Sequence, residues 1–473
     1  MLVWAATAGM IAMYLVVVGI TFYARVFDPT EYVYGESIVL DETHRLGAGQ
    51  PLYAPPTGLP LTVTAYPPVY YLLVGSLQQL SGNTGYSVGR IVSVAAVVAS
   101  AFLIAWSVHH IATHWAAGLL AAGLFVTQNL TVLLWGPTHR VDMLALCLTL
   151  FGLALATGCR TTLAAVPLAL AVLTKQSYLA APACVLFALW PRRGPIVRFS
   201  GVFVGTLLLS VGAGTWLTGD ELLWHTVVAN ANPLDYGYFT TMLSSFAQFN
   251  ALPLVAGAAL FGLPARPAER LWRAYFVLSG LAALATVGKI GASSNYWLEL
   301  TAATSVLIGL LAFRLCAASS ARGAFTSAGL AGVVLASLLT CLPAYQATLN
   351  ESVAMAVTGR SADDAGRFDA APLVAGEPGP VLTDDPGLAI LAGKRVEFEL
   401  IFTLLAIQGI WDESPILNAI RAREFGLVIV QEPLDAPSRP LTSERFTETV
   451  RAALREAYAP AGQLGGYWLY RPR

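Results

Sequence analysis

Charged residues of the apolar part of the chain lie at the ends of hydrophobic runs, where they could act on a substrate at a membrane surface. Glu36 opens a polar segment, 36–46, that is expected to be a short helix ended by glycines. Asp41 and Arg45 are four residues apart on it and can pair, whereas Glu36 has no basic residue three or four positions away. A carboxylate without a local partner can accept a proton from a hydroxyl, so Glu36 is a candidate general base. The alternative is that it only caps this helix.

Arg140 and Asp142 lie at the start of a later apolar run. They are two positions apart, so they do not face each other on a helix. A charge carried to the bilayer centre costs roughly 2.5–3.5 kcal/mol, so each is expected to have a partner or a task. The alternatives are an arginine that reaches the lipid head groups and a first-turn aspartate favoured by the helix dipole.

Polar residues also interrupt or begin two other apolar stretches of the chain. Lys175 and Gln176 divide an apolar stretch near its middle, which favours a tight turn between two short helices, with the lysine facing head groups or an anionic ligand. Asn295, Tyr296 and Glu299 bring amide, phenol and carboxylate groups to the start of another apolar run. Hydrogen bonding between helices is the alternative for these three.

Several kinds of site are not supported by the sequence. It contains no glycine-rich nucleotide loop and no G-x-S-x-G nucleophile motif. His110 and His114 have a metal-compatible spacing, but no carboxylate accompanies them, so packing at the membrane interface is favoured. The five cysteines fall in or beside hydrophobic segments, and no basic run suggests nucleic acid. We therefore predict no metal, no cofactor and no nucleic-acid partner.

Composition indicates the elements that must position these residues. The 473-residue chain is 56% hydrophobic and only 12% charged, about half the charged share of a soluble protein. Its first 350 residues divide into apolar runs close to the length that a bilayer core requires. We predict eleven membrane spans, at about 2–24, 86–108, 115–134, 141–158, 161–174, 177–190, 199–217, 248–263, 271–288, 297–313 and 325–345.

The loop charges suggest an orientation. A cytoplasmic N-terminus places most loop arginines inside, as the positive-inside rule requires, and nearly all loop carboxylates outside. Outer loops then cover 25–66 and 218–250, and residues 66–80 are expected to form a helix at the interface. This orientation also places the C-terminal part, 349–473, outside the membrane.

The C-terminal part reads as a small α/β domain following a membrane domain, 1–348. Ser443 is a candidate cap for a helix that carries Phe446, Val450, Leu454 and Tyr458 on one face. The expected strands are Val381–Thr383, Val396–Phe398, Gly426–Gln431 and Tyr467–Tyr470, with Gly426–Gln431 buried on both faces.

In this order, the polar motifs resemble those of the polytopic C-type glycosyltransferases, which include the protein O-mannosyltransferases and the aminoarabinose transferases of lipid A. The motifs spread over the whole membrane region, whereas the C-terminal part is less diagnostic. The matching stretches are Gly35-Glu36, Gly49 to Tyr53, Tyr66 to Tyr70, Arg140 to Asp142, Leu173 to Gln176 and Asn295 to Glu299.

The resemblance implies a C-type (GT-C-like) fold, an all-α polytopic bundle with juxtamembrane helices in the first outer loop, acting at the outer face of a bacterial cytoplasmic membrane. It implies inverting transfer of a sugar from a polyprenyl-phosphate donor to a glycan, lipid or protein acceptor, without a metal. Glu36 would be the base; better-known members carry an aspartate or an Asp-Glu pair where this chain has Gly35-Glu36, which keeps Asp41 as the alternative.

The same resemblance assigns the remaining polar groups to the substrates. Arg140 and Lys175 would neutralise the donor phosphate, with Asp142 and Gln176 beside them. Asn295, Tyr296 and Glu299 would contact sugar or acceptor. A transporter or lipid flippase is the alternative, although such proteins usually place their sites near the midplane in two related halves. A non-catalytic assembly or receptor subunit is a third reading.

Overall fold

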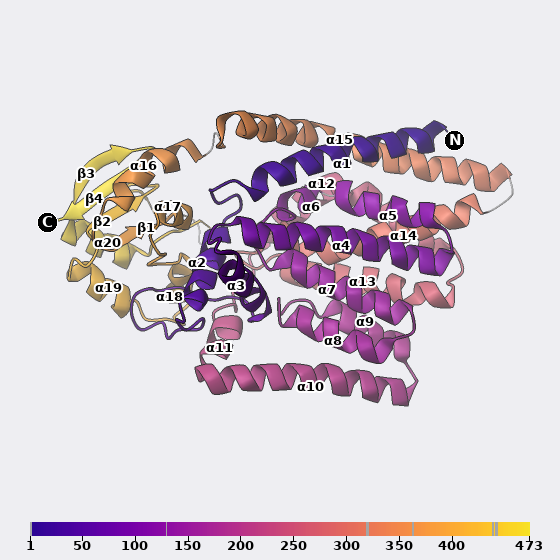
Figure 1. Cartoon of the computed structure of the whole chain (residues 1–473), viewed down its shortest axis with the longest axis horizontal. Coiled ribbons are helices and arrows are strands. Elements are labelled where there is room, and N and C mark those ends of the chain that lie inside the picture. The colour runs from indigo at the N-terminus through magenta and orange to yellow at the C-terminus, as the bar shows by residue number, and fades with distance from the viewer. Residues whose placement is uncertain (1, 129, 318–320, 362–363, 438, 440–442) are drawn as a thin grey trace.

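A computed structural model describes residues 2–128, 130–317, 321–361, 364–437, 439 and 443–473. Figure 1 shows a long helical bundle with a small sheet at one end, opposite the end where the N-terminus lies. The bundle helices are α1 (Leu2–Val26), α4 (Ser87–Ala112), α5 (Trp115–Thr127), α6 (Leu130–Trp135), α7 (Asp142–Thr157), α8 (Thr161–Val172), α9 (Ala180–Leu189), α10 (Arg193–Thr218), α12 (Tyr236–Ala258), α13 (Arg270–Thr286), α14 (Leu298–Cys316) and α15 (Ala321–Thr358).

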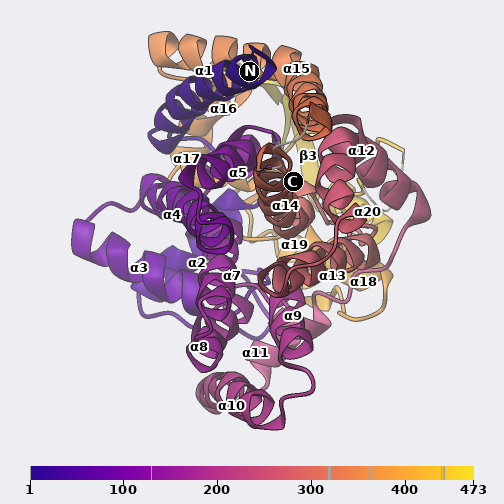
Figure 2. The same ribbon diagram turned by 90° about the vertical axis from the view of Figure 1, so that its right-hand side faces the viewer.

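The burial of the helices follows their position in the bundle. α14 is apolar on all sides and nearly all of its residues are buried, as expected for a central helix. α10 buries only Phe199, and Figures 1 and 2 both show it at the periphery. Its exposed side chains include Leu209 and Trp216, which suits a surface that faces lipid.

Every predicted span contains a helix. Among the described residues, six helices are long and apolar enough to cross a membrane: α1, α4, α10, α12, α14 and α15, with α12 and α14 each extended by a short 3₁₀ turn. The helices in the other five predicted spans are shorter, so the count of eleven spans stays a prediction. α15 continues unbroken to Thr358, beyond the predicted domain boundary at 348–349.

One predicted loop is largely helical. α12 begins at Tyr236, not near residue 248, because the Asp235 side chain accepts a hydrogen bond from the Tyr238 N–H and caps the helix. Residues 236–250 of the predicted outer loop 218–250 are therefore helical, and the side of the membrane on which the loop lies stays a prediction. Its first half contains α11 (Glu221–Leu223) and a π-helical turn (Trp224–Val228).

Between the bundle and the sheet lie two short helices, α2 (Glu36–Gly47) and α3 (Val69–Ser81). α2 confirms the predicted helix at 36–46, and α3 covers most of the predicted helix at 66–80, beginning three residues later and ending one residue later. Their contact buries Val39, Tyr70, Tyr71 and Val74.

The C-terminal sheet region (365–473) is built on four strands in the order β1-β2-β4-β3, with β1 and β2 parallel and the other pairs antiparallel. β2 is buried on both faces, as predicted, because two hydrophobic clusters cover it. The strands are β1 (Val381–Thr383), β2 (Leu427–Val430), β3 (Tyr458–Leu464) and β4 (Tyr467–Pro472), and the helices are α16 (Ala365–Ala375), α17 (Pro386–Leu391), α18 (Ile401–Ile407), α19 (Ser414–Arg421) and α20 (Glu448–Ala457).

Two predictions for this region are wrong. Val396–Phe398 does not join the sheet, because Phe398 pairs instead with Leu61 of the first outer loop in an isolated parallel bridge. The last helix is capped by Thr447, whose hydroxyl accepts from the Val450 N–H, and not by Ser443. Tyr458 then begins β3, a strand that was not predicted.

Candidate active site

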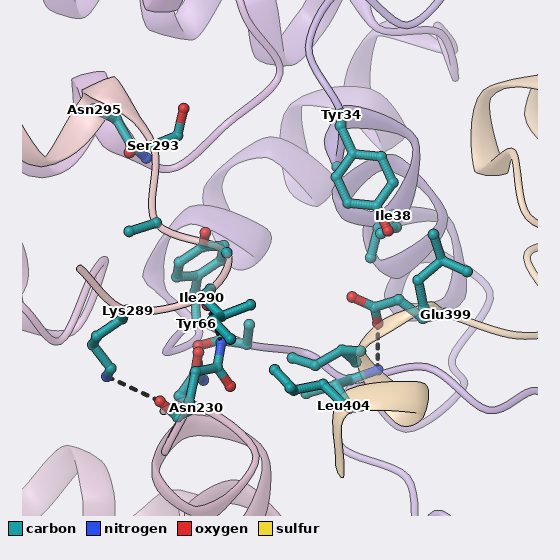
Figure 3. A pocket seen from close by; sticks show the side chains of 18 of the residues that line it. Tyr34, Ile38, Tyr66, Asn230, Lys289, Ile290, Ser293, Asn295, Glu399 and Leu404 are labelled. Carbon is teal, nitrogen blue, oxygen red and sulfur yellow. Dashed lines mark hydrogen bonds between the residues drawn. The ribbon is translucent and has the colours of Figure 1, made fainter. Parts of the chain in front are cut away.

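A cavity of about 1020 Å³ lies between α2, the turns at one end of the bundle and the C-terminal sheet region. Figure 3 shows Asn295 and Lys289 on one side of it and Glu399 and Leu404 on the other. Its charged lining residues are Glu42, Arg140, Lys175, Lys289, Glu399, Arg439, Glu444 and Arg445. The bundle side thus contributes cations, α2 contributes a carboxylate, and the sheet region contributes both carboxylates and arginines.

Asp142 is the centre of a buried polar cluster beside this cavity. Its Oδ1 accepts hydrogen bonds from Lys175 Nζ at 2.5 Å and Asn295 Nδ2 at 2.8 Å, and its Oδ2 lies 3.9 Å from Arg140 Nε. Asp142 is the first residue of α7, Lys175 lies in the turn between α8 and α9, and Asn295 lies in a 3₁₀ turn before α14. Helix ends far apart in sequence thus bring these predicted residues together.

Gln176 and Tyr296 complete this predicted group in the cavity wall. The Gln176 amide donates to the backbone carbonyls of Ala65 and Thr226, both at 2.9 Å. The Tyr296 ring lies 4.9 Å from Lys175 Nζ, which is a cation–π distance. Among the described residues, some buried atoms here make no hydrogen bond: Asp142 Oδ2, Arg140 Nε, Asn295 Oδ1 and Gln176 Oε1. These atoms are sealed from solvent, so they are unsatisfied buried polar groups in the cluster beside the cavity.

Arg140 is held against the first outer loop. Its Nη2 donates to the Tyr66 hydroxyl at 2.7 Å, and its Nη1 donates to the Tyr34 carbonyl at 3.3 Å. Gly35 has a φ of +92°, and a Cβ there would lie 2.0 Å from Arg140 Nη1. Only glycine permits this approach. The Gly35 of the Gly35-Glu36 motif is thus explained by the position of Arg140.

The expectation that Glu36 lacks a partner is wrong. Its Oε2 and Oε1 lie 2.8 and 3.0 Å from Arg90 Nη2 and Nε, and backbone N–H groups of Tyr32, Val33 and His139 also donate to it. Glu36 is fully buried, and it is not a lining residue of the cavity. Arg90 and these N–H groups hold the pKa of Glu36 below its usual value against the effect of burial. The carboxylate is therefore poorly placed to take a proton.

Arg90 is saturated in the same way. Its remaining N–H groups donate to the backbone carbonyls of Arg25, Asp28 and Thr30, so all five of its donors are used. Arg90 was not predicted as a partner because it lies 54 residues from Glu36, inside an apolar helix.

Asp41 and Glu299 also lie outside the cavity lining. Asp41 pairs with Arg45 at 3.2 Å, as predicted, and faces a separate cavity of about 610 Å³ on the opposite side of α2. Glu299, on α14, accepts a hydrogen bond from the Tyr275 hydroxyl at 3.0 Å, which corresponds to the alternative of bonding between helices. Neither side chain joins the Asp142 cluster.

The two histidines whose spacing could suit a metal, His110 and His114, make packing and capping contacts. His110 stacks on Trp106, and the His114 ring nitrogen accepts from the Ala117 N–H to cap α5. The described residues contain no group of three or more potential metal ligands.

Three carboxylates that were not predicted as site residues line the cavity: Glu42, Glu399 and Glu444. Both Glu42 oxygens are sealed and have no hydrogen-bond partner of good geometry among the described residues, although the Tyr71 and Thr64 hydroxyls favour its charged form. Burial raises the pKa of Glu42 to about 8 and that of Glu399 to about 7. The position of Glu42 on the predicted helix, one residue past Asp41, could have indicated that it lines the site. No feature of the sequence indicated this for Glu399, because its segment was expected to be part of the sheet.

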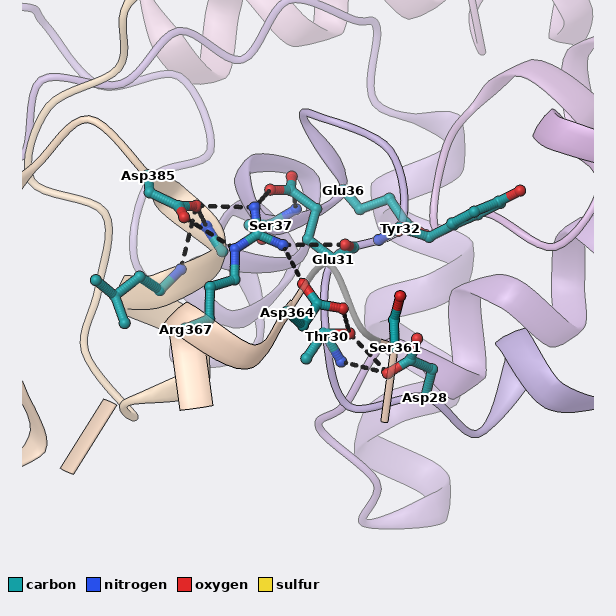
Figure 4. Close-up of polar contacts among 12 residues, drawn as sticks. Asp28, Thr30, Glu31, Tyr32, Glu36, Ser37, Ser361, Asp364, Arg367 and Asp385 are labelled. Carbon is teal, nitrogen blue, oxygen red and sulfur yellow. Dashed lines mark hydrogen bonds and ion pairs between the residues drawn. The ribbon is translucent and has the colours of Figure 1, made fainter. Parts of the chain in front are cut away.

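A second polar cluster, around Arg367, links the sheet region to the first outer loop (Figure 4). Arg367 makes two hydrogen bonds to Asp385, at 2.8 and 3.0 Å, and one to Asp364 at 2.9 Å. It also lies 3.5 Å from Glu31 of the first outer loop, whose Oε1 accepts from the Gly35 and Ser37 N–H groups. This Arg367 cluster thus connects the sheet directly to the start of α2.

The chain matches no known family model and no curated protein. It does match solved structures over nearly its whole length. ArnT from Cupriavidus metallidurans, a lipid A aminoarabinose transferase, matches with a TM-score of 0.60 at 13% identity, over 98% of each chain. The same protein bound to undecaprenyl phosphate gives a TM-score of 0.58 at 14% identity, again over 98% of each chain.

A second type of glycosyltransferase has a similar structure. Archaeal oligosaccharyltransferase AglB from Archaeoglobus fulgidus, in complex with an inhibitory peptide and a dolichol-phosphate, matches with a TM-score of 0.52 at 11% identity, over 98% of this chain and 74% of that chain. The chain therefore has the fold of the C-type membrane glycosyltransferases, as the order of its polar motifs predicted.

Proposed function

We propose that the protein is a membrane glycosyltransferase that takes a sugar from a polyprenyl-phosphate donor and passes it to an acceptor at the outer face of the membrane. The observation that carries the proposal is the cavity, which has cations and carboxylates in its wall and lies at the bundle end that meets the sheet region. Relatives by fold have been solved with undecaprenyl phosphate and with dolichol-phosphate.

The donor phosphate would lie beside Arg140 and Lys175. These two cations and Asp142 have a net charge of about +1, which matches the single negative charge of a phosphodiester. When the sugar leaves, the lipid phosphate gains a second negative charge. Fixed cations in a poorly hydrated site stabilise that developing charge more strongly than water does. Lys289, which donates to the Asn230 carbonyl at 3.0 Å, adds a further cation to the same wall.

The sugar and acceptor would occupy the space between this cluster and the sheet region. Asn295 and Tyr296 offer contacts to sugar hydroxyls from the bundle side. Direct displacement at the anomeric carbon by an acceptor hydroxyl would invert its configuration. This arrangement has reactive groups at one end of the bundle, which favours transfer over the alternative of transport through a midplane site.

The test uses purified protein in lipid nanodiscs with a panel of undecaprenyl-phosphate-linked sugars. We expect wild-type protein to release undecaprenyl phosphate from one donor and to bind undecaprenyl phosphate alone. Lys175→Met should weaken that binding at least tenfold, because it leaves Asp142 without its closest cation. The matched control is Lys394→Met, whose ammonium group bonds only the Glu377 carbonyl in the sheet region among the described residues.

Two outcomes would contradict the proposal. One is wild-type protein that binds no lipid phosphate and consumes no donor. The other is ion-coupled uptake of a solute into proteoliposomes without any transfer, which would establish the transport alternative.

A further inference from the structure

Part of the C-terminal sheet region leaves the sheet and joins the first outer loop beside the cavity. The Leu61 N–H donates to the Glu397 carbonyl at 2.8 Å, and the Glu399 N–H donates to the Leu61 carbonyl at 2.9 Å. Phe398, between the two glutamates, is buried in one hydrophobic cluster with Leu61 and Val63. This short pairing fixes Glu399 at the wall of the cavity (Figure 3).

The two oxygens of Glu399 have different surroundings. Oε2 accepts a hydrogen bond from the Val63 N–H at 2.8 Å, which orients the carboxylate. Oε1 accepts none from the described residues, and unlike both Glu42 oxygens it is not sealed from solvent. The side chain is otherwise well buried, with 7% of the residue exposed. Glu399 thus presents one free oxygen to the cavity from a fixed support.

The charges around Glu399 suit a proton acceptor. Burial raises the pKa of Glu399 to about 7, while the Val63 N–H and the nearby Arg45 and Arg140 partly restore its charged form. A general base works best when its pKa lies near the working pH. Glu399 lines the same cavity as Arg140 and Lys175, the proposed phosphate-binding cations.

We propose that Glu399, supplied by the C-terminal sheet region, is the general base that activates the acceptor hydroxyl, and that the acceptor therefore binds against the 399–404 wall. This inference rests on the proposed glycosyl transfer. As the acceptor oxygen bonds to the anomeric carbon, its proton moves to Glu399 Oε1. The bond between that carbon and the phosphate oxygen breaks, and the electron pair leaves with the lipid phosphate. Glu399 then releases the proton to water.

The other carboxylates are less suited to this role. Glu36 is saturated by five donors, Asp41 faces the opposite side of α2, and both Glu42 oxygens are sealed. Glu444, also in the wall, accepts a hydrogen bond from the Arg439 N–H and lies 3.7 Å from Arg451.

The test is Glu399→Gln, which keeps an oxygen for the Val63 N–H but removes the base. We expect kcat for transfer to fall at least 100-fold, with undecaprenyl phosphate binding and donor KM within twofold of wild type. Wild-type kcat/KM should rise with pH up to about 7 and then level off, and the variant should lose that rise. Glu397→Gln is the matched control, because Glu397 lies in the same segment, pairs with Arg395 at 2.7 Å and is not a lining residue.

Other results would overturn the assignment. If Glu399→Gln keeps more than a tenth of the wild-type rate and Glu42→Gln does not, Glu42 is the base. If Glu399→Gln loses lipid binding in parallel with the rate, Glu399 only supports the loop. Wild-type protein without any transfer would refute the proposed function itself, and this inference with it.

Discussion

At the scale of single residues, the most completely satisfied charges are Glu36 and Arg90. Each side chain is fully buried, and every donor and acceptor position has a partner within the chain. Because His139, which donates to Glu36, precedes Arg140, this pair also fixes the backbone that carries the proposed phosphate ligand. We interpret Glu36 as a positioning residue, not as the base.

This interpretation predicts the effect of Glu36→Gln. All contacts to Glu36 are donors, so an amide group would place N–H against N–H and leave Arg90 as an unpaired buried cation. Breaking a buried pair costs about 3–5 kcal/mol, and we expect a clearly lower melting temperature by differential scanning fluorimetry. Asp41→Asn, at the less buried pair with Arg45, is the comparison and should lower it less.

A variant that melts like wild type but has lost transfer would restore Glu36 as the base. The sequence singled out Arg140, Asp142, Lys175 and Asn295 because polar groups at the ends of apolar runs are costly unless they have partners or a task. The structure brings these residues together in one cluster, and their role at a substrate stays a prediction. It could not show that Glu36 has a partner, because Arg90 reaches it only through the tertiary packing of α4.

At the scale of elements, α2 separates two different environments. Glu42 faces the large cavity, while Asp41 and Arg45 face the smaller one, so adjacent carboxylates on one helix have unrelated surroundings. The sequence predicted this helix within one residue, but its two faces were not distinguishable. For residues 396–398, too, the sequence indicated the local conformation but not the neighbour. Their apolar pattern is typical of a strand, but Phe398 pairs with Leu61 of the first outer loop and not with the sheet.

The Arg367 cluster predicts how the sheet region is held. Arg367→Met would leave Asp385, Asp364 and Glu31 without their shared cation. We therefore expect the free energy of unfolding to fall by roughly 3 kcal/mol, the lower end for a broken buried pair. Faster hydrogen exchange at α2 and the first outer loop would show that the attachment, not only the sheet, is weakened.

Arg471→Met is the matched control, since the Arg471 side chain is 47% exposed and its ion pair with Glu377 is therefore partly solvated. Equal effects of the two variants would contradict the special role of Arg367.

At the scale of the whole molecule, buried carboxylates set the response to pH. Burial raises the pKa of Glu31 to about 7, of Glu42 to about 8 and of Glu399 to about 7. An unfolded chain releases these protons near its ordinary pKa of about 4.3. Through these three carboxylates the folded protein binds more protons between about pH 4.5 and 8, so their contribution to stability falls as the pH rises through this range. Burial lowers the pKa of His139 and His225 to about 4, so these two groups act in the opposite sense, but only below about pH 6.5.

We expect the melting temperature in nanodiscs to be higher at pH 5.5 than at pH 8. Glu42→Gln should reduce that difference, because a neutral amide removes the group with the highest pKa of the three. Glu456→Gln, at an exposed position on α20, should leave it unchanged. A melting temperature that rises from pH 5.5 to 8 in the wild type would refute this prediction.

The length of α15 has a consequence for how the protein responds to its lipid surroundings. Its 38 residues extend for about 57 Å, nearly twice the thickness of a bilayer core. The same rod that crosses the lipid thus continues toward the sheet region. A long helix tilts differently in thinner and thicker bilayers. We therefore expect the length of the lipid acyl chains to change the distance between Lys175 in the bundle and Glu399 in the sheet region.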